Sequence, residues 1–162
     1  MKYIMSETIV IAFSSAQSVQ RSDEFHICPE GKAHVLKFLE NASRLLSNKK
    51  GLVFSSPETA AIETAGLIGK KLGVDNQVMK IALDSDQFAY EALNHILANN
   101  ECRKANIIFL VGNGDFVKSF TELFASEIHG TVRNICPIGE GCAWKMSMTS
   151  PEIKPLSGHD FM

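Results

Sequence analysis

The stretch VFSSPETAAIETA, residues 53–65, decides the fold that we expect for this chain. Two apolar residues lead into two serines and Pro57, and proline suits the first position of a helix because its missing N–H would have no partner there. Either serine is a candidate cap for that helix. Apolar residues then recur at helical spacing as far as Leu72, and Gly73 stands where a left-handed residue often ends a helix. The stretch therefore predicts a strand, a sharp turn and a helix of about four turns.

Similar patterns recur along the chain. Residues 9–13 and 106–111 are strongly apolar, which is typical of strands covered on both faces, and weaker strand patterns lie at 78–83 and 142–148. Apolar residues at helical spacing predict three further helices. One follows Cys28 as far as Leu46, one follows Asp86 as its cap, and one follows Gly114. Residues 16–27 and the tail from Thr149 predict loops. We expect one domain over residues 1–162, a three-layer α/β/α sandwich with a mostly parallel central sheet.

Composition narrows the functional classes. The net charge of −2 over 162 residues provides no general attraction to nucleic acid or to an acidic membrane surface. No apolar run is long enough to span a bilayer, and the start of the chain lacks the apolar region of a signal peptide. The four cysteines form no Cys-x-x-Cys pair, so we expect buried thiols in a cytoplasmic protein with no bound metal and no cofactor.

Three short motifs in this order resemble those of the histidine phosphatase superfamily, which has the phosphoglycerate mutase-like fold. Residues 55–65 are similar to its Ser-Ser-Pro-Leu-x-Arg-Ala-x-Gln-Thr-Ala segment. Pro29-Glu30-Gly31 is similar to its Leu-Thr-Pro-x-Gly helix start, and residues 111–114 resemble the segment that carries its second histidine. The resemblance runs from about Ile9 to Trp144 and implies a small, minimally decorated member.

The same resemblance implies a phosphohistidine enzyme, but the residues that carry its chemistry are replaced. After the first strand, Phe13 and Ser14 stand where the family has an arginine and its nucleophilic histidine. Ala60 replaces the arginine of the Ser-Ser-Pro helix, and Asn113 replaces the second histidine. Arginine and histidine would clamp and attack the phosphoryl group, so we expect a pseudoenzyme with a binding or regulatory role.

The remaining donors at these positions predict a site for a small polar or weakly anionic ligand. The candidate binding residues are Ser14, Ser15, Ser55, Ser56, Asn113, Gly114 and Arg21. The family's general acid has no clear counterpart among the acidic residues of the 84–91 stretch, Asp84, Asp86 and Glu91. The five histidines fall on none of the motifs and are expected to be structural.

Other functions stay open from the sequence. The first is an enzyme with altered chemistry that uses Ser14 as a nucleophile, which requires a base beside the hydroxyl. The second is a dinucleotide loop at Gly112-Asn113-Gly114, although the third glycine of that motif is absent. A protein partner is also open.

Overall fold

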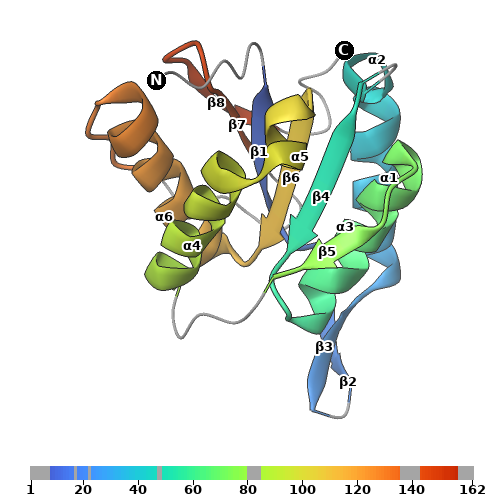
Figure 1. Ribbon diagram of the computed structural model, residues 1–162. Coiled ribbons are helices and arrows are strands. Elements are labelled where there is room, and N and C mark those ends of the chain that lie inside the picture. The colour runs from blue at the N-terminus through green and yellow to red at the C-terminus, as the bar shows by residue number, and fades with distance from the viewer. Residues whose placement is uncertain are drawn as a thin grey trace.

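The computed structural model describes residues 8–16, 18–21, 23–46, 49–79, 85–135 and 143–156 (Figure 1). In chain order the elements are β1 (Ile9–Ser14), β2 (Ser18–Arg21), β3 (Glu24–Ile27), α1 (Pro29–Asn41), α2 (Ser43–Leu46), β4 (Gly51–Ser55), α3 (Thr59–Leu72), β5 (Asn76–Val78), α4 (Ser85–Ala98), α5 (Asn100–Lys104), β6 (Ile107–Gly112), α6 (Gly114–Phe124), the π-helical turn η1 (Ala125–His129), β7 (Ala143–Ser147) and β8 (Ile153–Leu156). Within these ranges no helix combines the length and apolar character needed to cross a membrane.

The central sheet confirms the predicted α/β/α architecture. Its strand order is β5-β4-β6-β1-β7-β8, in which the first four strands are parallel and the last two join antiparallel. Helices α1 and α3 cover one face, and α4 and α6 cover the other (Figure 1). The two most apolar segments of the sequence form β1 and β6, which pair in the middle of the sheet and are buried on both faces.

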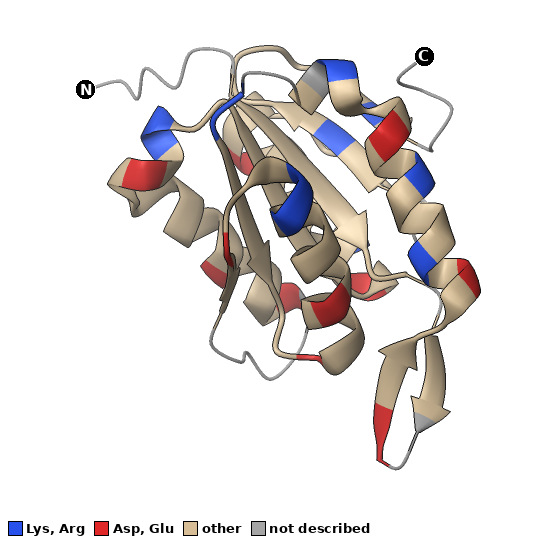
Figure 2. Ribbon diagram, turned by 90° about the vertical axis from the view of Figure 1, so that its right-hand side faces the viewer, with Lys and Arg blue, Asp and Glu red and all other residues tan. Residues whose placement is uncertain are grey.

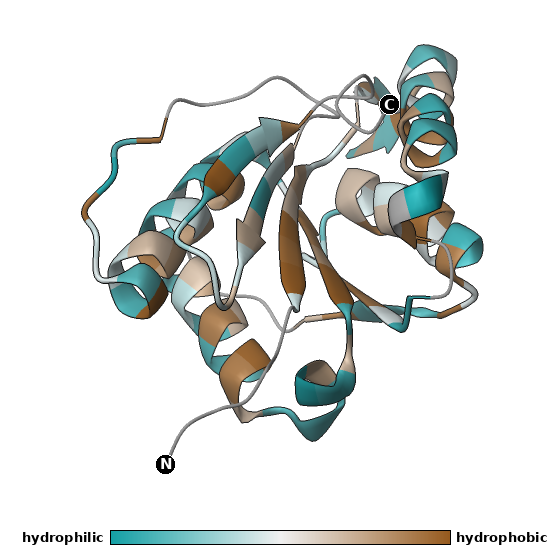
Figure 3. Ribbon diagram, turned by 90° about the horizontal axis from the view of Figure 1, so that it is seen from above, coloured by the Kyte–Doolittle hydropathy of each residue, from teal (hydrophilic) through white to brown (hydrophobic). Residues whose placement is uncertain are grey.

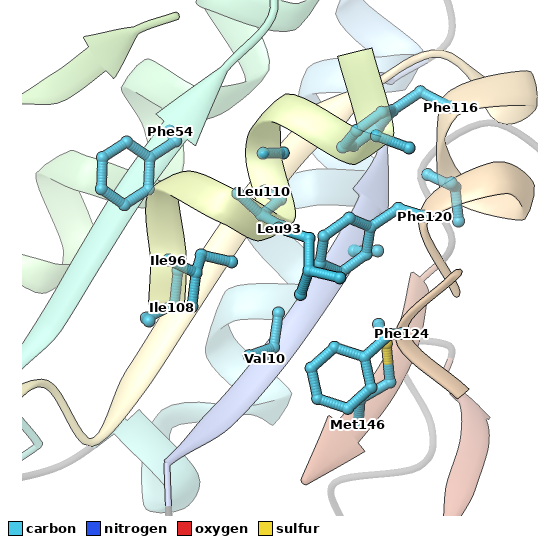
Figure 4. Packing of buried hydrophobic residues seen from close by; sticks show 14 of the residues in the cluster. Val10, Phe54, Leu93, Ile96, Ile108, Leu110, Phe116, Phe120, Phe124 and Met146 are labelled. Atoms are coloured by element: carbon cyan, nitrogen blue, oxygen red, sulfur yellow. The ribbon is translucent and has the colours of Figure 1, made fainter. Parts of the chain in front are cut away.

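Side chains on the two faces of the sheet build two apolar cores. Viewed from above, brown apolar strands lie between the helical layers (Figure 3). Phe116, Phe120 and Phe124 of α6 belong to the core on one face, which also includes Val10 of β1 and Met146 of β7 (Figure 4). The stripe of α3 packs on the other face, and Gly73 ends that helix with φ 75°. The helices thereby cover both faces of the middle of the sheet.

Residues 16–27 correct one expectation. They form a hairpin of β2 and β3 that makes its own two-stranded sheet, not a loop. Val19 is 41% exposed and Phe25 is 55% exposed, and the polar–apolar alternation of residues 24–27 is only four residues long, so it did not stand out from a loop. The prediction of a loop for the tail from Thr149 was also wrong, because Ile153–Leu156 form β8 at the edge of the sheet. Pro155 is tolerated there because an edge strand has one unpaired side.

Several element boundaries also differ from those predicted. Strand β5 lies earlier than residues 78–83, of which 80–83 are outside the described residues. The helix that follows Cys28 is interrupted at Ala42, and α2 continues after it. Asp86 lies in the first turn of α4 instead of capping it. Helix α3 begins at Thr59 after Glu58, so Pro57 precedes it and neither serine caps it.

Candidate functional site

The candidate site lies where the carboxyl ends of β1, β4 and β6 meet. Helix α1 follows β1 on one face of the sheet and α6 follows β6 on the other, so the neighbouring strands diverge at a topological switch point. Two backbone bonds hold the chain together just past the strand ends. Ser15 N donates to Gly112 O at 2.8 Å, and Ser56 N donates to Val111 O at 2.9 Å.

A pocket of about 460 Å³ opens beside these strand ends. Its wall comes from three parts of the chain: the hairpin and the residue before it, the start of α3, and the start of α6. The lining residues are Ser15, Ser18, Asp23, Glu24, Phe25, Pro57, Glu58, Thr59, Ala60 and Asn113. The pocket is therefore built between the hairpin and the first turns of two helices.

Three of the residues singled out from the sequence line this pocket, namely Ser15, Ala60 and Asn113. Asn113 caps α6, because its Oδ1 accepts the N–H of Phe116 at 2.8 Å. Ala60 sits in the first turn of α3 and offers only a methyl group where the resembled family has an arginine. The pocket coincides with the predicted site at these positions.

Phe13 and Ser14 do not line the pocket. The Phe13 ring is fully buried under α1, edge-on to Phe38 with ring centroids 5.0 Å apart. Ser14 is only 3% exposed, and in the described part of the chain no histidine, lysine or carboxylate hydrogen-bonds to its hydroxyl. A serine without a base is a poor nucleophile, so this geometry disfavours the alternative enzyme that uses Ser14.

The other predicted ligand-binding residues have structural partners or lie elsewhere. The buried Ser55 hydroxyl accepts a hydrogen bond from Asn76 Nδ2 at 2.8 Å, which ties β4 to the edge strand. Ser56 is buried, and Gly114 begins α6 without lining the pocket. The side chain of Arg21 lies outside the described residues.

The acidic candidates are also placed away from the pocket. Asp86 Oδ1 accepts the Ser119 hydroxyl at 2.6 Å, which links α4 to α6. Glu91 lines a separate pocket of about 390 Å³ with His95. Asp84 lies outside the described residues. Neither described residue provides a general acid for the pocket at the strand ends.

The charge of the pocket is the feature that the sequence reading missed. Asp23, Glu24 and Glu58 bring three carboxylates to the lining, and the described lining residues include no lysine or arginine. In Figure 2 the projecting hairpin has red acidic positions and no blue basic ones among the residues whose side chains are described. Glu58 Oε1 accepts the Ser56 hydroxyl at 3.2 Å and Asn113 Nδ2 at 3.4 Å. A signal existed, because Glu58 stands where the Ser-Ser-Pro motif of the resembled family has leucine.

No metal site or reactive thiol accompanies the pocket in the described ranges. They hold no cluster of three or more histidine, cysteine or acidic side chains able to bind a metal. Cys28 and Cys102 are buried free thiols, as expected, and Cys136 and Cys142 lie outside the described residues. Burial raises the pKa of Cys102 to about 11, with a smaller contribution from Glu101. That thiol is therefore protonated and inert at neutral pH.

Comparison with solved structures identifies the fold. The chain is similar to the protein histidine phosphatase SixA in complex with tungstate, with a TM-score of 0.66 and 11% identity over 96% of this chain and 100% of that one. It is similar to a mycobacterial glucosyl-3-phosphoglycerate phosphatase in complex with inorganic phosphate, with a TM-score of 0.61 and 11% identity over 93% and 97% of the two chains. For a mutant phosphoserine phosphatase from Entamoeba histolytica in complex with phosphoserine, the TM-score is 0.62 and the identity 14% over 96% and 98%.

The chain thus has the phosphoglycerate mutase-like fold that its sequence predicted. No protein-family model and no curated protein matches its sequence. At 10–15% identity the structural likeness defines the fold and leaves the activity to be argued from the pocket.

Proposed function

We propose that this protein is a histidine phosphatase-like pseudoenzyme whose pocket binds a small polar ligand in place of turning over a phosphoryl group. The observation that carries the proposal is the position of Glu58, whose carboxylate contacts Asn113 at the site of the resembled family's second histidine. The first turns of α3 and α6 both begin at this point. Helix starts attract anions, and here the chain supplies one of its own.

Phosphate binding is disfavoured by what the pocket has gained and by what it lacks. A charge-assisted hydrogen bond contributes about 1.5–3 kcal/mol, so two missing arginines weaken phosphate binding by about 3–6 kcal/mol. That loss is roughly a hundredfold to ten-thousandfold in affinity. The carboxylates of Asp23, Glu24 and Glu58 add repulsion, and they favour a neutral or positively charged polar group.

The nearest alternative is hydrolysis by Ser14, and its burial and lack of a neighbouring base speak against it. We also propose a single domain over residues 1–162, supported by the two cores that share one sheet. The cytoplasmic location stays a prediction from the sequence.

The proposal is tested by assaying hydrolysis of p-nitrophenyl phosphate and of a phosphohistidine peptide, together with calorimetric titration of inorganic phosphate. We expect neither turnover nor phosphate binding. Turnover by the wild type that disappears in Ser14→Ala or Asn113→Ala would overturn the proposal.

A gain-of-binding variant tests the electrostatic reasoning directly. The double substitution Glu58→Leu with Ala60→Arg removes the internal anion and restores a guanidinium in the first turn of α3. We expect this variant to bind phosphate measurably and Glu91→Leu, outside the pocket, to behave like the wild type. Equal phosphate binding by the wild type and the double variant would show that Glu58 and Ala60 do not set the selectivity.

A further inference from the structure

The hairpin of β2 and β3 needs support from the body of the protein. It projects from the end of the molecule as its own two-stranded sheet (Figure 1). A hairpin of that size is marginally stable by itself in water. Its apolar side chains Val19 and Phe25 are exposed, so burial within the hairpin does little to hold it. Ile27, at the end of β3, packs against the core beside α3, so burial holds the base of the hairpin. The rest of the hairpin depends on specific bonds to that helix.

Two consecutive residues of α3 provide those bonds. Glu63 Oε1 accepts the backbone N–H of Ile27 at 2.8 Å, and Glu63 Oε2 lies 3.0 Å from Nδ1 of His26. A carboxylate only accepts, so the His26 proton is on Nδ1 in this contact. Thr64 Oγ1 accepts the N–H of Ala16 at 3.0 Å. The chain is thus held just before it enters β2 and again where it leaves β3.

Glu63 differs from Thr64 in what it holds. Thr64 is fully buried and also donates to Ala60 O at 2.8 Å, so it is part of the helix packing. The Glu63 side chain is 35% exposed and both of its contacts go to β3. Glu24 Oε2 lies 3.6 Å from His26 Nε2, beyond hydrogen-bond distance, so the link from Glu63 to the hairpin runs through His26 Nδ1 and the backbone of Ile27. Glu63 is therefore connected to the hairpin wall of the pocket and not to the core.

We propose that Glu63 is the positioning residue that sets the shape of the pocket, by fixing the hairpin against α3. The hairpin provides Ser18, Asp23, Glu24 and Phe25 to the lining, and the start of α3 provides the opposing wall, so their separation determines what the pocket accepts. This inference rests on the proposed function, because the shape of the pocket matters only if the pocket binds a ligand. The sequence departs here from the resembled motif, which has glutamine at this position.

Amide hydrogen exchange of the unliganded full chain tests the proposal. In Glu63→Ala we expect the amide exchange rates of residues 18–27 to rise roughly tenfold or more. The variant lacks the bonds that hold the hairpin on α3, so the hairpin opens more often. The exchange rates of residues 107–112 of β6 should not change in this variant. In the control Glu40→Ala, which removes an exposed carboxylate from α1, the exchange rates of the hairpin should also stay as in the wild type. In Glu63→Gln the amide oxygen can still accept the Ile27 N–H, and the amide NH2 can donate to His26 Nδ1 once the imidazole proton is on Nε2, so this variant should restore most of the protection.

A second readout separates positioning from local stability. The amide chemical shift of Asn113, which lines the pocket from α6, should change in Glu63→Ala and return in Glu63→Gln. Unchanged hairpin exchange in Glu63→Ala would overturn the proposal, and so would faster exchange with an unaltered Asn113 shift or failure of the glutamine rescue. These measurements use no ligand, so they test the role of Glu63 separately from the proposed function. Phosphatase activity of the wild type would overturn the proposed function and leave the role of Glu63 in place.

Discussion

Two glycines of α3 allow a test of how closely the C-terminal half of this helix packs against the chain that leads into β5. Gly66 is exposed, and a Cβ placed on it would meet nothing within 4 Å. A Cβ placed on Gly69 would lie 2.5 Å from the carbonyl oxygen of Val74, whose N–H also donates to Gly69 O at 2.9 Å. This close approach lets the chain turn from α3 directly into β5. The substitutions Gly66→Ala and Gly69→Ala are therefore a matched pair on one helix.

The magnitudes follow from two terms. Replacing a helical glycine by alanine stabilises a helix by about 0.5–1 kcal/mol, and this term applies to both variants. Gly69→Ala must also displace a backbone oxygen, and overpacking of this kind costs about 1–3 kcal/mol. The shared term cancels in the comparison, so Gly66→Ala should exceed Gly69→Ala in stability by about 1–3 kcal/mol. That is a difference of roughly 2–12 °C in melting temperature.

Urea denaturation followed by circular dichroism measures the difference. We expect Gly66→Ala to be more stable than the wild type, with an unchanged m-value. If Gly69→Ala matches Gly66→Ala in unfolding free energy, the close contact between α3 and Val74 is not a constraint and the reasoning fails.

Three further predictions concern single side chains. Asn113→Ala removes the cap of α6 and should lower the unfolding free energy by about 1 kcal/mol, measured with urea; no change would show that the cap is replaceable. Cys102, whose pKa burial raises to about 11, should resist a disulfide reagent at pH 8 until the chain is denatured; rapid labelling of the native protein would contradict its burial. Burial acts to raise the pKa of Glu122, but hydrogen bonds from Lys118 and the N–H of Ile135 outweigh it, so the net pKa is below 4.5. A lowered folded-state pKa stabilises the protein above the unfolded value and this contribution is lost as the pH falls. Glu122→Gln should therefore lose stability at pH 7 and show a shallower decline below about pH 4.5, and parallel stability curves would refute this.

Local patterns were sufficient where burial decides the structure. The runs that became β1 and β6 are apolar throughout because both faces are covered, and the apolar spacing of α3 and α6 matches their buried stripes. These elements determine the sheet order and the place where its strands diverge. The position of the pocket at Ala60 and Asn113 could therefore be predicted.

The pocket walls could not be predicted in the same way. The hairpin has exposed apolar side chains, and α3 holds it through contacts of Glu63 with residues 26–27, which are far away in the sequence. A local pattern contains no record of such a bond. Strand β8 was missed for a related reason, since Pro155 argues against a strand unless its place at an edge is already known. The role of Glu58 could not be predicted from the motif, because its contact with Asn113 joins residues that are far apart in the sequence.

The contact of Glu58 with Asn113 has a consequence for how stability and occupancy are linked. A pocket lined by cations repels itself when empty, so a bound anion stabilises the folded state by mass action. In this protein the Glu58 carboxylate accepts the Asn113 amide beside the starts of α3 and α6, and Asp23 and Glu24 line the same pocket. The described lining is therefore anionic, which reverses the sign of the linkage. Added phosphate should not raise the melting temperature, whereas a bound cationic group should stabilise the folded state.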